Sequence, residues 1–166
     1  MPKKLIWVAA GLALVLVALV LVAWNRKRSD ANELIAAYTR AACVPPHVKE
    51  ASAREPVRAW DQTFDLGSGV SAKIDAACSM SASVTAKYSD EPAVRTVARP
   101  GDYLYPCDLR IDWMQMRLYV RADGLSGGVS QRTELYEYDL QARQSPRTAV
   151  VEPGGLPPRC DIDWSK

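Results

Sequence analysis

Residues Gly124 to Gly128 read Gly-Leu-Ser-Gly-Gly, which satisfies the G-x-S-x-G pattern of a hydrolase nucleophile elbow. In such a site a histidine takes the proton of the serine as the serine attacks a carbonyl. The chain has one histidine, His47, and it precedes Ser126, whereas the elbow fold places its histidine last. The segment after Gly128 also has the pattern of a strand rather than the required helix. We therefore expect a hairpin loop, and we keep a small envelope hydrolase built on Ser126 as an alternative.

Carboxylates form three close groups, and two facing carboxylates are what glycoside hydrolysis requires. The spacing shows no cleft between them, and residues two apart on a strand share one face, which is commonly solvated. No group supplies the oxygen ligands of a calcium loop, and His47 has no second histidine with which to hold a metal. We assign no catalytic residue, no metal and no cofactor, and we expect a protein that is not an enzyme. The groups are Asp108 with Asp112, Asp161 with Asp163, and Glu134 with Glu137 and Asp139.

The four cysteines predict two disulfides. They are separated by 35, 29 and 53 residues, so no pair has the short spacing of zinc ligands. An even number of widely spaced cysteines in a small domain is typical of disulfides, which persist outside the cytosol. Four unpaired, buried thiols in a cytoplasmic domain are the alternative. The four positions are Cys43, Cys78, Cys107 and Cys160.

The N-terminal segment predicts a transmembrane helix over residues 5–24. From Leu5 to Trp24 the chain has 20 residues without a charge, Asn, Gln or Pro. A helix of this length spans about 30 Å, the thickness of the hydrocarbon core of a bilayer. Trp7 and Trp24 lie near its two ends, where tryptophan favours the membrane interface. A cleaved secretory signal, leaving a secreted soluble protein, is the alternative, although Leu21 is a poor residue three positions before a cleavage site.

The cysteines also decide the predicted orientation. Basic residues flank the span on both sides, so the positive-inside rule hardly separates the two topologies. Because disulfides require an oxidising compartment, we expect residues 1–4 in the cytoplasm and the C-terminal part outside it. The sequence thus predicts a single-pass protein of a bacterial-type inner (plasma) membrane with a periplasmic domain.

The remaining chain predicts a short helix followed by strands. Ser29 and Asp30 are helix-capping residues, and a juxtamembrane helix is expected within residues 25–46. From Val70 to Tyr88 the even positions are small or apolar and the odd ones polar, apart from Ala77, which predicts a bent strand or two strands with a common buried face. We expect an α+β, mainly β fold over residues 47–166, a single antiparallel domain of about seven strands. Further strands are expected at 62–66, 109–113, 117–122, 132–140 and 148–152.

Two segments near the C-terminus repeat each other. Residues 106–113 and 158–164 both run from proline through Cys-Asp to Asp-Trp, and the strands between them include the run ELYEYDL. This order resembles one blade of a β-propeller, but the chain is too short for a complete propeller. We expect a single meandering sheet with a coincidental repeat.

Three disulfide pairings are open to four cysteines. We predict Cys43 with Cys78, which would fix the helix end to the alternating strand, and Cys107 with Cys160, which would join the two repeated segments.

The candidate binding surface lies on two of the expected strands. If Leu118 and Val120 point inward, the odd-numbered residues of the same strand point outward. In the strand at 132–140, an inward Leu135 places the even-numbered residues, which are polar or aromatic, on the outward side. Tyrosine and arginine are enriched in protein interfaces. The alternative is that both faces of this sheet are covered and the tyrosines lie in the core. The candidate residues are Arg117, Tyr119, Arg121, Glu134, Tyr136 and Tyr138.

The charge balance narrows the class of partner. Outside the membrane segment and its flanking lysines and arginines, 16 basic residues face 19 acidic ones, a net charge of −3. Without a basic cluster, this domain is not expected to bind nucleic acid. Our leading hypothesis is a membrane-anchored module that binds an envelope protein, or an incoming toxin as an immunity factor.

Overall fold

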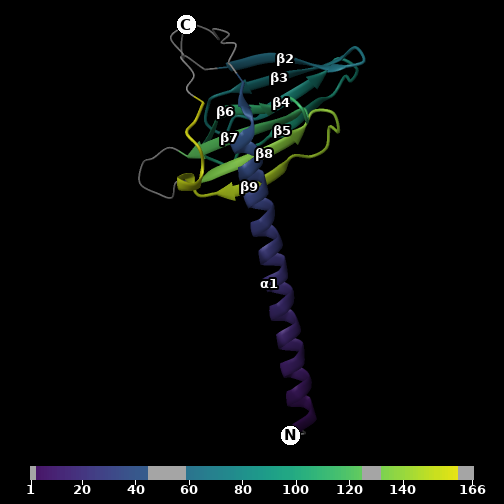
Figure 1. Cartoon of the computed structure of the whole chain (residues 1–166), viewed down its shortest axis with the longest axis vertical. Helices are drawn as coiled ribbons and strands as arrows, with labels where there is room; N and C mark the ends of the chain where they lie inside the picture. The colour runs from purple at the N-terminus through teal and green to yellow at the C-terminus, as the bar shows by residue number, and fades with distance from the viewer. Residues whose placement is uncertain (1–2, 45–58, 125–131, 161–166) are drawn as a thin grey trace. The chain divides into compact units, whose positions relative to one another are not determined.

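The computed structural model describes residues 3–44, 59–124 and 132–160, with side chains from Leu12 onward except at positions 59, 60 and 153. The chain divides into two compact units, Met1–Glu33 and Leu34–Lys166. Within the described residues, two antiparallel sheets and one long helix make an α+β fold (Figure 1).

Helix α1 runs without interruption from Lys3 to Arg40. Ser29 and Asp30 therefore lie inside this helix rather than at a helix start, and the helix expected within residues 25–46 is the continuation of α1 up to Arg40. The helix ends where the amide of Ala41 donates to the carbonyls of Ala37 and Tyr38, and the strand β1 (Ala42–Cys43) follows directly. From Leu12 onward, where side chains are described, no helical segment is long and apolar enough to span a membrane.

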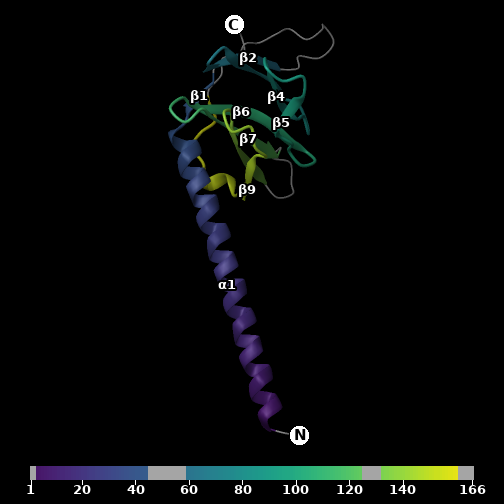
Figure 2. The ribbon, with the colours of Figure 1, turned by 90° about the vertical axis from the view of Figure 1, so that its right-hand side faces the viewer.

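The strands form two sheets rather than the single sheet expected. The five-stranded sheet has the order β1-β6-β7-β8-β9 and the four-stranded sheet the order β2-β3-β4-β5, with every pairing antiparallel. Figures 1 and 2 show the two sheets stacked face to face. The short helix η1 (Pro153–Gly155) follows the last strand. The remaining bounds are β2 (Ala59–Gly67), β3 (Val70–Ala77), β4 (Val84–Tyr88), β5 (Val94–Ala98), β6 (Leu104–Asp112), β7 (Arg117–Gly124), β8 (Thr133–Asp139) and β9 (Arg147–Val151).

The alternating segment from Val70 to Tyr88 forms two strands, β3 and β4, which share a buried face. This is one of the two forms that we predicted for it. β3 buries its even positions from Ala72 to Ala76, and β4 buries Val84, Ala86 and Tyr88. The hairpin between β2 and β3 turns through Gly67 and Gly69, whose φ angles are 83° and 76°. Glycine suits these positions because a Cβ atom is unfavourable at positive φ.

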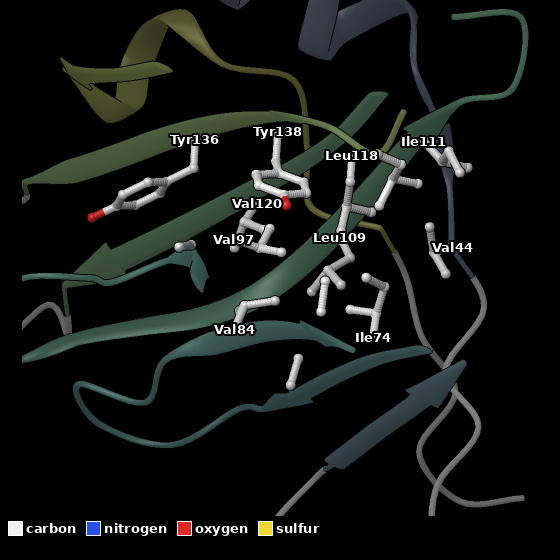
Figure 3. Close-up of a cluster of buried hydrophobic side chains, with 14 of the residues drawn as sticks. Val44, Ile74, Val84, Val97, Leu109, Ile111, Leu118, Val120, Tyr136 and Tyr138 are labelled. Carbon is white, nitrogen blue, oxygen red and sulfur yellow. The ribbon is translucent and has the colours of Figure 1, made fainter. Parts of the chain in front are cut away.

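The main core lies between the two sheets. Figure 3 shows Leu109, Leu118 and Val120 of the five-stranded sheet above Ile74 and Val84 of the four-stranded sheet. Each of these side chains is at most 2% exposed. Burying one such aliphatic side chain stabilises the fold by about 1.5 to 3 kcal/mol. This core therefore fixes the orientation of both sheets.

A second apolar cluster covers the opposite face of the five-stranded sheet. Leu34 and Tyr38, at the end of α1, pack with Tyr119 of β7, Leu135 of β8 and Val151 of β9. The five-stranded sheet is therefore covered on both faces, and we call the face that meets the helix end its outer face.

The four cysteines form two disulfides, as predicted, but the predicted pairing is wrong. Cys43 bonds to Cys160 and Cys78 to Cys107, with Cα–Cα distances of 5.8 and 4.6 Å. Cys43 lies in β1, whose register with β6 places it opposite Arg110, whereas Cys78 follows β3 in the other sheet. The bulge of β6 falls between Pro106 and Asp108, at the bonded Cys107. Two disulfides hint at an oxidising, extracytoplasmic compartment.

Candidate functional site

The six residues predicted as one binding surface lie on two different faces of the sheet. The register pairs Val120 with Tyr136 and Leu118 with Tyr138, so both tyrosines point into the core between the sheets. Leu135 instead pairs with Arg121 and packs on the outer face. Our prediction that Leu135 points into the core was therefore wrong, and the faces of its neighbours in β8 were exchanged. Directly paired residues share a face in an antiparallel ladder.

Five of those six residues are buried, so they do not form an open surface. Tyr119 is 1% exposed, Tyr138 1%, and Tyr136 and Glu134 5% each. Arg121 is 8% exposed, and only Arg117 is half-buried. The alternative, in which both faces are covered, is the one observed.

The outer face carries a buried group of charges that we call the charged face: Asp108, Arg110, Arg121 and Asp123, together with Tyr38. The Tyr38 hydroxyl donates to Asp108 Oδ2 over 2.6 Å, and the Arg110 guanidinium lies 4.4 Å from the centre of the Tyr38 ring. Arg121 Nε donates to Asp123 Oδ1 at 2.9 Å. Cations and carboxylates thus neutralise one another inside the fold, which is the condition for burying them.

Residues 156–160, which we call the C-terminal strap, lie over this charged face. Arg121 Nη1 donates to the Pro157 carbonyl at 2.8 Å, and Arg110 Nη2 to the Pro158 carbonyl at 2.7 Å. In return Arg159 Nε donates to Asp123 Oδ2 at 2.8 Å, and the Cys160 amide to Asp108 Oδ2 at 3.3 Å. The sequence could not reveal these contacts. Two of the four use backbone carbonyls, which every residue type has, so no side-chain pattern marks them.

The charged face has no open acid or base. Burial, and then the charge of Asp108, raise the pKa of Tyr38 well above its usual value, so its hydroxyl stays protonated and acts as a donor. The Asp108 carboxylate accepts from Tyr38 and lies 1% exposed beneath the strap. This arrangement holds the helix end and the strap in place.

The other predicted carboxylates also serve the fold. Glu137 is paired with Arg117 at 2.7 Å and Arg147 at 3.1 Å, and Glu134 with Arg132 at 2.6 Å. Asp112 and Asp139 accept backbone amides in the turns that follow their strands. Within the described ranges, no group of His, Cys, Asp and Glu could hold a metal ion. Ser126, His47, Asp161 and Asp163 lie outside those ranges.

One end of the two-sheet stack presents a surface that the sequence reasoning missed, which we call the loop patch: Met80, Ser81, Asp102 and Tyr103. Tyr103 is 73% exposed and Met80 53%. Ser81 Oγ accepts from the Tyr103 amide at 3.2 Å, and the Ser81 amide donates to the Leu104 carbonyl at 2.8 Å. These bonds join the β3–β4 loop to the β5–β6 loop.

Both loops of the patch have unfavourable backbone angles. Ser81 and Tyr103 have φ angles of 56° and 65°, each at the third position of a turn closed by a backbone hydrogen bond. Glycine or asparagine is usual at a turn position with positive φ, and a bulky residue there is uncommon. Such conformations persist only where the surroundings enforce them, and they are frequent at functional sites.

A second exposed apolar site lies in the turn between β6 and β7, at the opposite end of β6 from Tyr103. Met114 is 97% exposed and Trp113 is 54% exposed, with the Trp113 ring 5.5 Å from that of Phe64. Met116, at φ 50°, ends this turn, where a left-handed residue is common in hairpins. The positive φ of Met116 is therefore explained by its place in a hairpin turn, whereas the positive φ of Tyr103 has no such explanation.

Comparison with known proteins assigns no relative to this chain: no family model matches it, and neither a curated protein nor a solved structure does so.

Proposed function

We propose that α1 anchors the protein in a membrane through residues 5–24. The proposal is supported by the uncharged sequence from Leu5 to Trp24 and by the helix that includes all of it. The large apolar side chains of α1 from Leu12 to Trp24 are 51 to 72% exposed. A helix that is apolar on every side is suited to lipid rather than water. The basic residues at 26–28 would then lie at the headgroups.

Alkaline carbonate extraction tests the anchor. The wild-type protein is expected in the membrane pellet with an uncleaved N-terminus, because about 20 apolar residues insert strongly. A variant with Leu14→Arg and Val17→Arg places two charges in the middle of the span and should move to the soluble fraction. Arg26→Gln with Lys27→Gln, outside the span, is the matched control and should stay in the pellet. A soluble wild-type protein beginning after Ala23 would instead establish a cleaved signal.

We further propose that the extracytoplasmic domain is a binding module and that the loop patch contacts its partner. The observation that carries this proposal is Tyr103, a large aromatic side chain 73% exposed on a backbone with φ of 65°. An exposed tyrosine beside an exposed methionine is typical of interface composition. The Cys78–Cys107 bond and the Ser81 hydrogen bonds hold both loops, so little conformational entropy is lost on binding.

A comparison of two substitutions tests the patch. Tyr103→Gly removes the side chain and relieves the positive φ, so it should weaken binding by about tenfold or more without lowering stability. Met114→Ser, at the other end of β6, removes an apolar side chain that is even more exposed than Tyr103 and should leave binding unchanged. Proteins captured from solubilised membranes by wild type, Tyr103→Gly and Met114→Ser are quantified by mass spectrometry. Equal capture by all three proteins, or loss with Met114→Ser alone, would contradict the assignment of the patch.

A photocrosslinker supplies a second, direct measurement. Placed at Met80, it should join the same partner that Tyr103→Gly fails to capture. Placed at Val150, an equally exposed residue of β9, it should not. Crosslinks from Val150 and not from Met80 would move the binding surface to the edge of the five-stranded sheet.

A further inference from the structure

The C-terminal strap is attached to the domain by two unlike means, a covalent bond and a set of polar contacts. The covalent bond is Cys43–Cys160, which joins the last strap residue to β1. The polar contacts are the four hydrogen bonds to Arg110, Arg121, Asp108 and Asp123. Of the strap side chains, only Leu156 packs against an apolar cluster. Little hydrophobic burial therefore holds the strap.

The charged face beneath the strap is incompletely satisfied. Asp108 Oδ1 and Arg110 Nε are buried and have no hydrogen-bond partner, and they face each other at 3.6 Å, beyond a good hydrogen bond. Asp108 is 1% and Arg110 7% exposed. A buried charge with an unmade hydrogen bond loses hydration that it would regain in water. If the strap left the charged face, water could hydrate these two groups. This hydration opposes the polar contacts that hold the strap on the charged face.

The two disulfides differ in their surroundings. Cys43 is exposed in the two-residue strand β1, at the edge of the five-stranded sheet, and its partner Cys160 is half-buried. Cys78 and Cys107 are both half-buried and pack against the core between the sheets. The rate of thiol–disulfide exchange depends on access of the attacking thiolate to a sulfur. A reductant should therefore reach Cys43–Cys160 first.

We propose that the Cys43–Cys160 disulfide is a redox latch, whose reduction with Cys78–Cys107 intact releases the strap and uncovers the charged face. A dithiol attacks one sulfur through its thiolate and forms a mixed disulfide, and its second thiol then displaces the protein. The dithiol is oxidised to a disulfide, and Cys43 and Cys160 are left as two thiols. All strand pairings of both sheets can survive this step, because the bond joins only β1 and the strap. The uncovered surface presents Arg110 and Arg121, freed from the proline carbonyls.

Graded reduction of the full-length wild-type protein tests the order of opening. The protein is incubated with increasing dithiothreitol, quenched with an alkylating reagent, and mapped by mass spectrometry. Cys43 and Cys160 should become alkylated at a dithiothreitol concentration about tenfold lower than Cys78 and Cys107. Simultaneous opening of both bonds, or earlier opening of Cys78–Cys107, overturns the proposal.

Proteolysis then tests release of the strap. Cys43→Ser with Cys160→Ser should be cleaved by trypsin after Arg159 much faster than oxidised wild type, while near-ultraviolet circular dichroism stays that of the folded domain. The matched variant, Cys78→Ser with Cys107→Ser, should keep Arg159 protected for as long as it remains folded. Equal protection of Arg159 in the first variant and wild type refutes the latch. The graded reduction uses the wild-type protein, so it tests the proposal even if one of the cysteine variants fails to fold. Neither measurement requires a binding partner.

Discussion

Replacing Tyr38 by phenylalanine removes one buried hydroxyl and changes little else. Tyr38 is fully buried, and its hydroxyl donates to Asp108 Oδ2 over 2.6 Å. Phenylalanine keeps the ring that packs against Tyr119 and Leu135 and lies 4.4 Å from the Arg110 guanidinium. The substitution therefore isolates the hydrogen bond from the packing.

The expected loss follows from the charge and burial of the acceptor. A hydrogen bond to a charged group contributes about 1.5 to 3 kcal/mol. The Cys160 amide still donates to the same oxygen, at the longer distance of 3.3 Å, which keeps the loss below the upper end. We expect Tyr38→Phe to lower the free energy of unfolding by about 2 kcal/mol. For a domain of this size that corresponds to a fall in Tm of about 6 to 10 °C.

Urea denaturation of the full chain in detergent, followed by near-ultraviolet circular dichroism, measures this loss. The matched control is Tyr103→Phe, which removes an exposed hydroxyl and should change the unfolding free energy by less than about 0.5 kcal/mol. A double-mutant cycle with Asp108→Asn should give a coupling energy of at least about 1 kcal/mol. Additive effects in that cycle, or a Tyr38→Phe protein within about 0.5 kcal/mol of wild type, would refute the assigned role of the hydroxyl.

Two further outcomes can be checked by the same denaturation assay. Hydrogen bonds from Arg143 lower the pKa of both Asp90 and Glu91, with Arg95 also bonded to Glu91, and a lowered pKa contributes stability that is lost as pH falls through the folded value. The urea midpoint of wild type should therefore fall more steeply below about pH 4 than that of Arg143→Gln, and parallel curves would contradict this origin. Gly69 has a φ of 76°, so Gly69→Ala should lower the unfolding free energy by about 1 to 2 kcal/mol, whereas Ser68→Gly, at φ 55°, should not lower it. Equal losses in both variants would show that backbone conformation does not govern this turn.

Period-two patterning predicted most strands because each has one face in the core between the sheets. Ile74 and Ala76 in β3, and Leu109 and Ile111 in β6, alternate with more polar residues. β3 lies within the expected alternating segment, whereas β6 overlaps the strand expected at 109–113 but begins at Leu104. Strand β5 was missed because Val97 and Ala98 are consecutive buried residues, which break the alternation. Alternation also cannot say which strands are neighbours, so the division into two sheets was not predicted.

The candidate surface was misassigned for a different physical reason. A sheet face covered by an apolar layer shows apolar residues, but part of the outer face is covered by the C-terminal strap, whose contacts are mostly polar. Arg121 and Asp123 therefore have the sequence pattern of a solvated face although both are buried. Besides bonding to each other, they contact the Pro157 carbonyl and the Arg159 side chain, which lie far along the chain and which no local pattern encodes. The strain at Tyr103 is likewise a property of two loops that meet in space.

The local capping signal at Ser29 and Asp30 failed because a helix already formed upstream continues through them. A capping residue stabilises a helix start only where the preceding residues are not helical. The cysteines show a related limit: their number and spacing predicted two bonds, but the pairing depends on which strand lies opposite which.

The bond between Cys43 and Cys160 also determines how the molecule bears mechanical load. It joins positions 117 residues apart, so everything between them, including both sheets, forms one closed covalent loop. Cys43 follows the end of α1 by three residues. A force pulling on the C-terminal end therefore passes through a single S–S bond to the helix. The strands between Cys43 and Cys160 then carry none of this force. Only after that bond is reduced does the same pull act on β9 and the strands behind it.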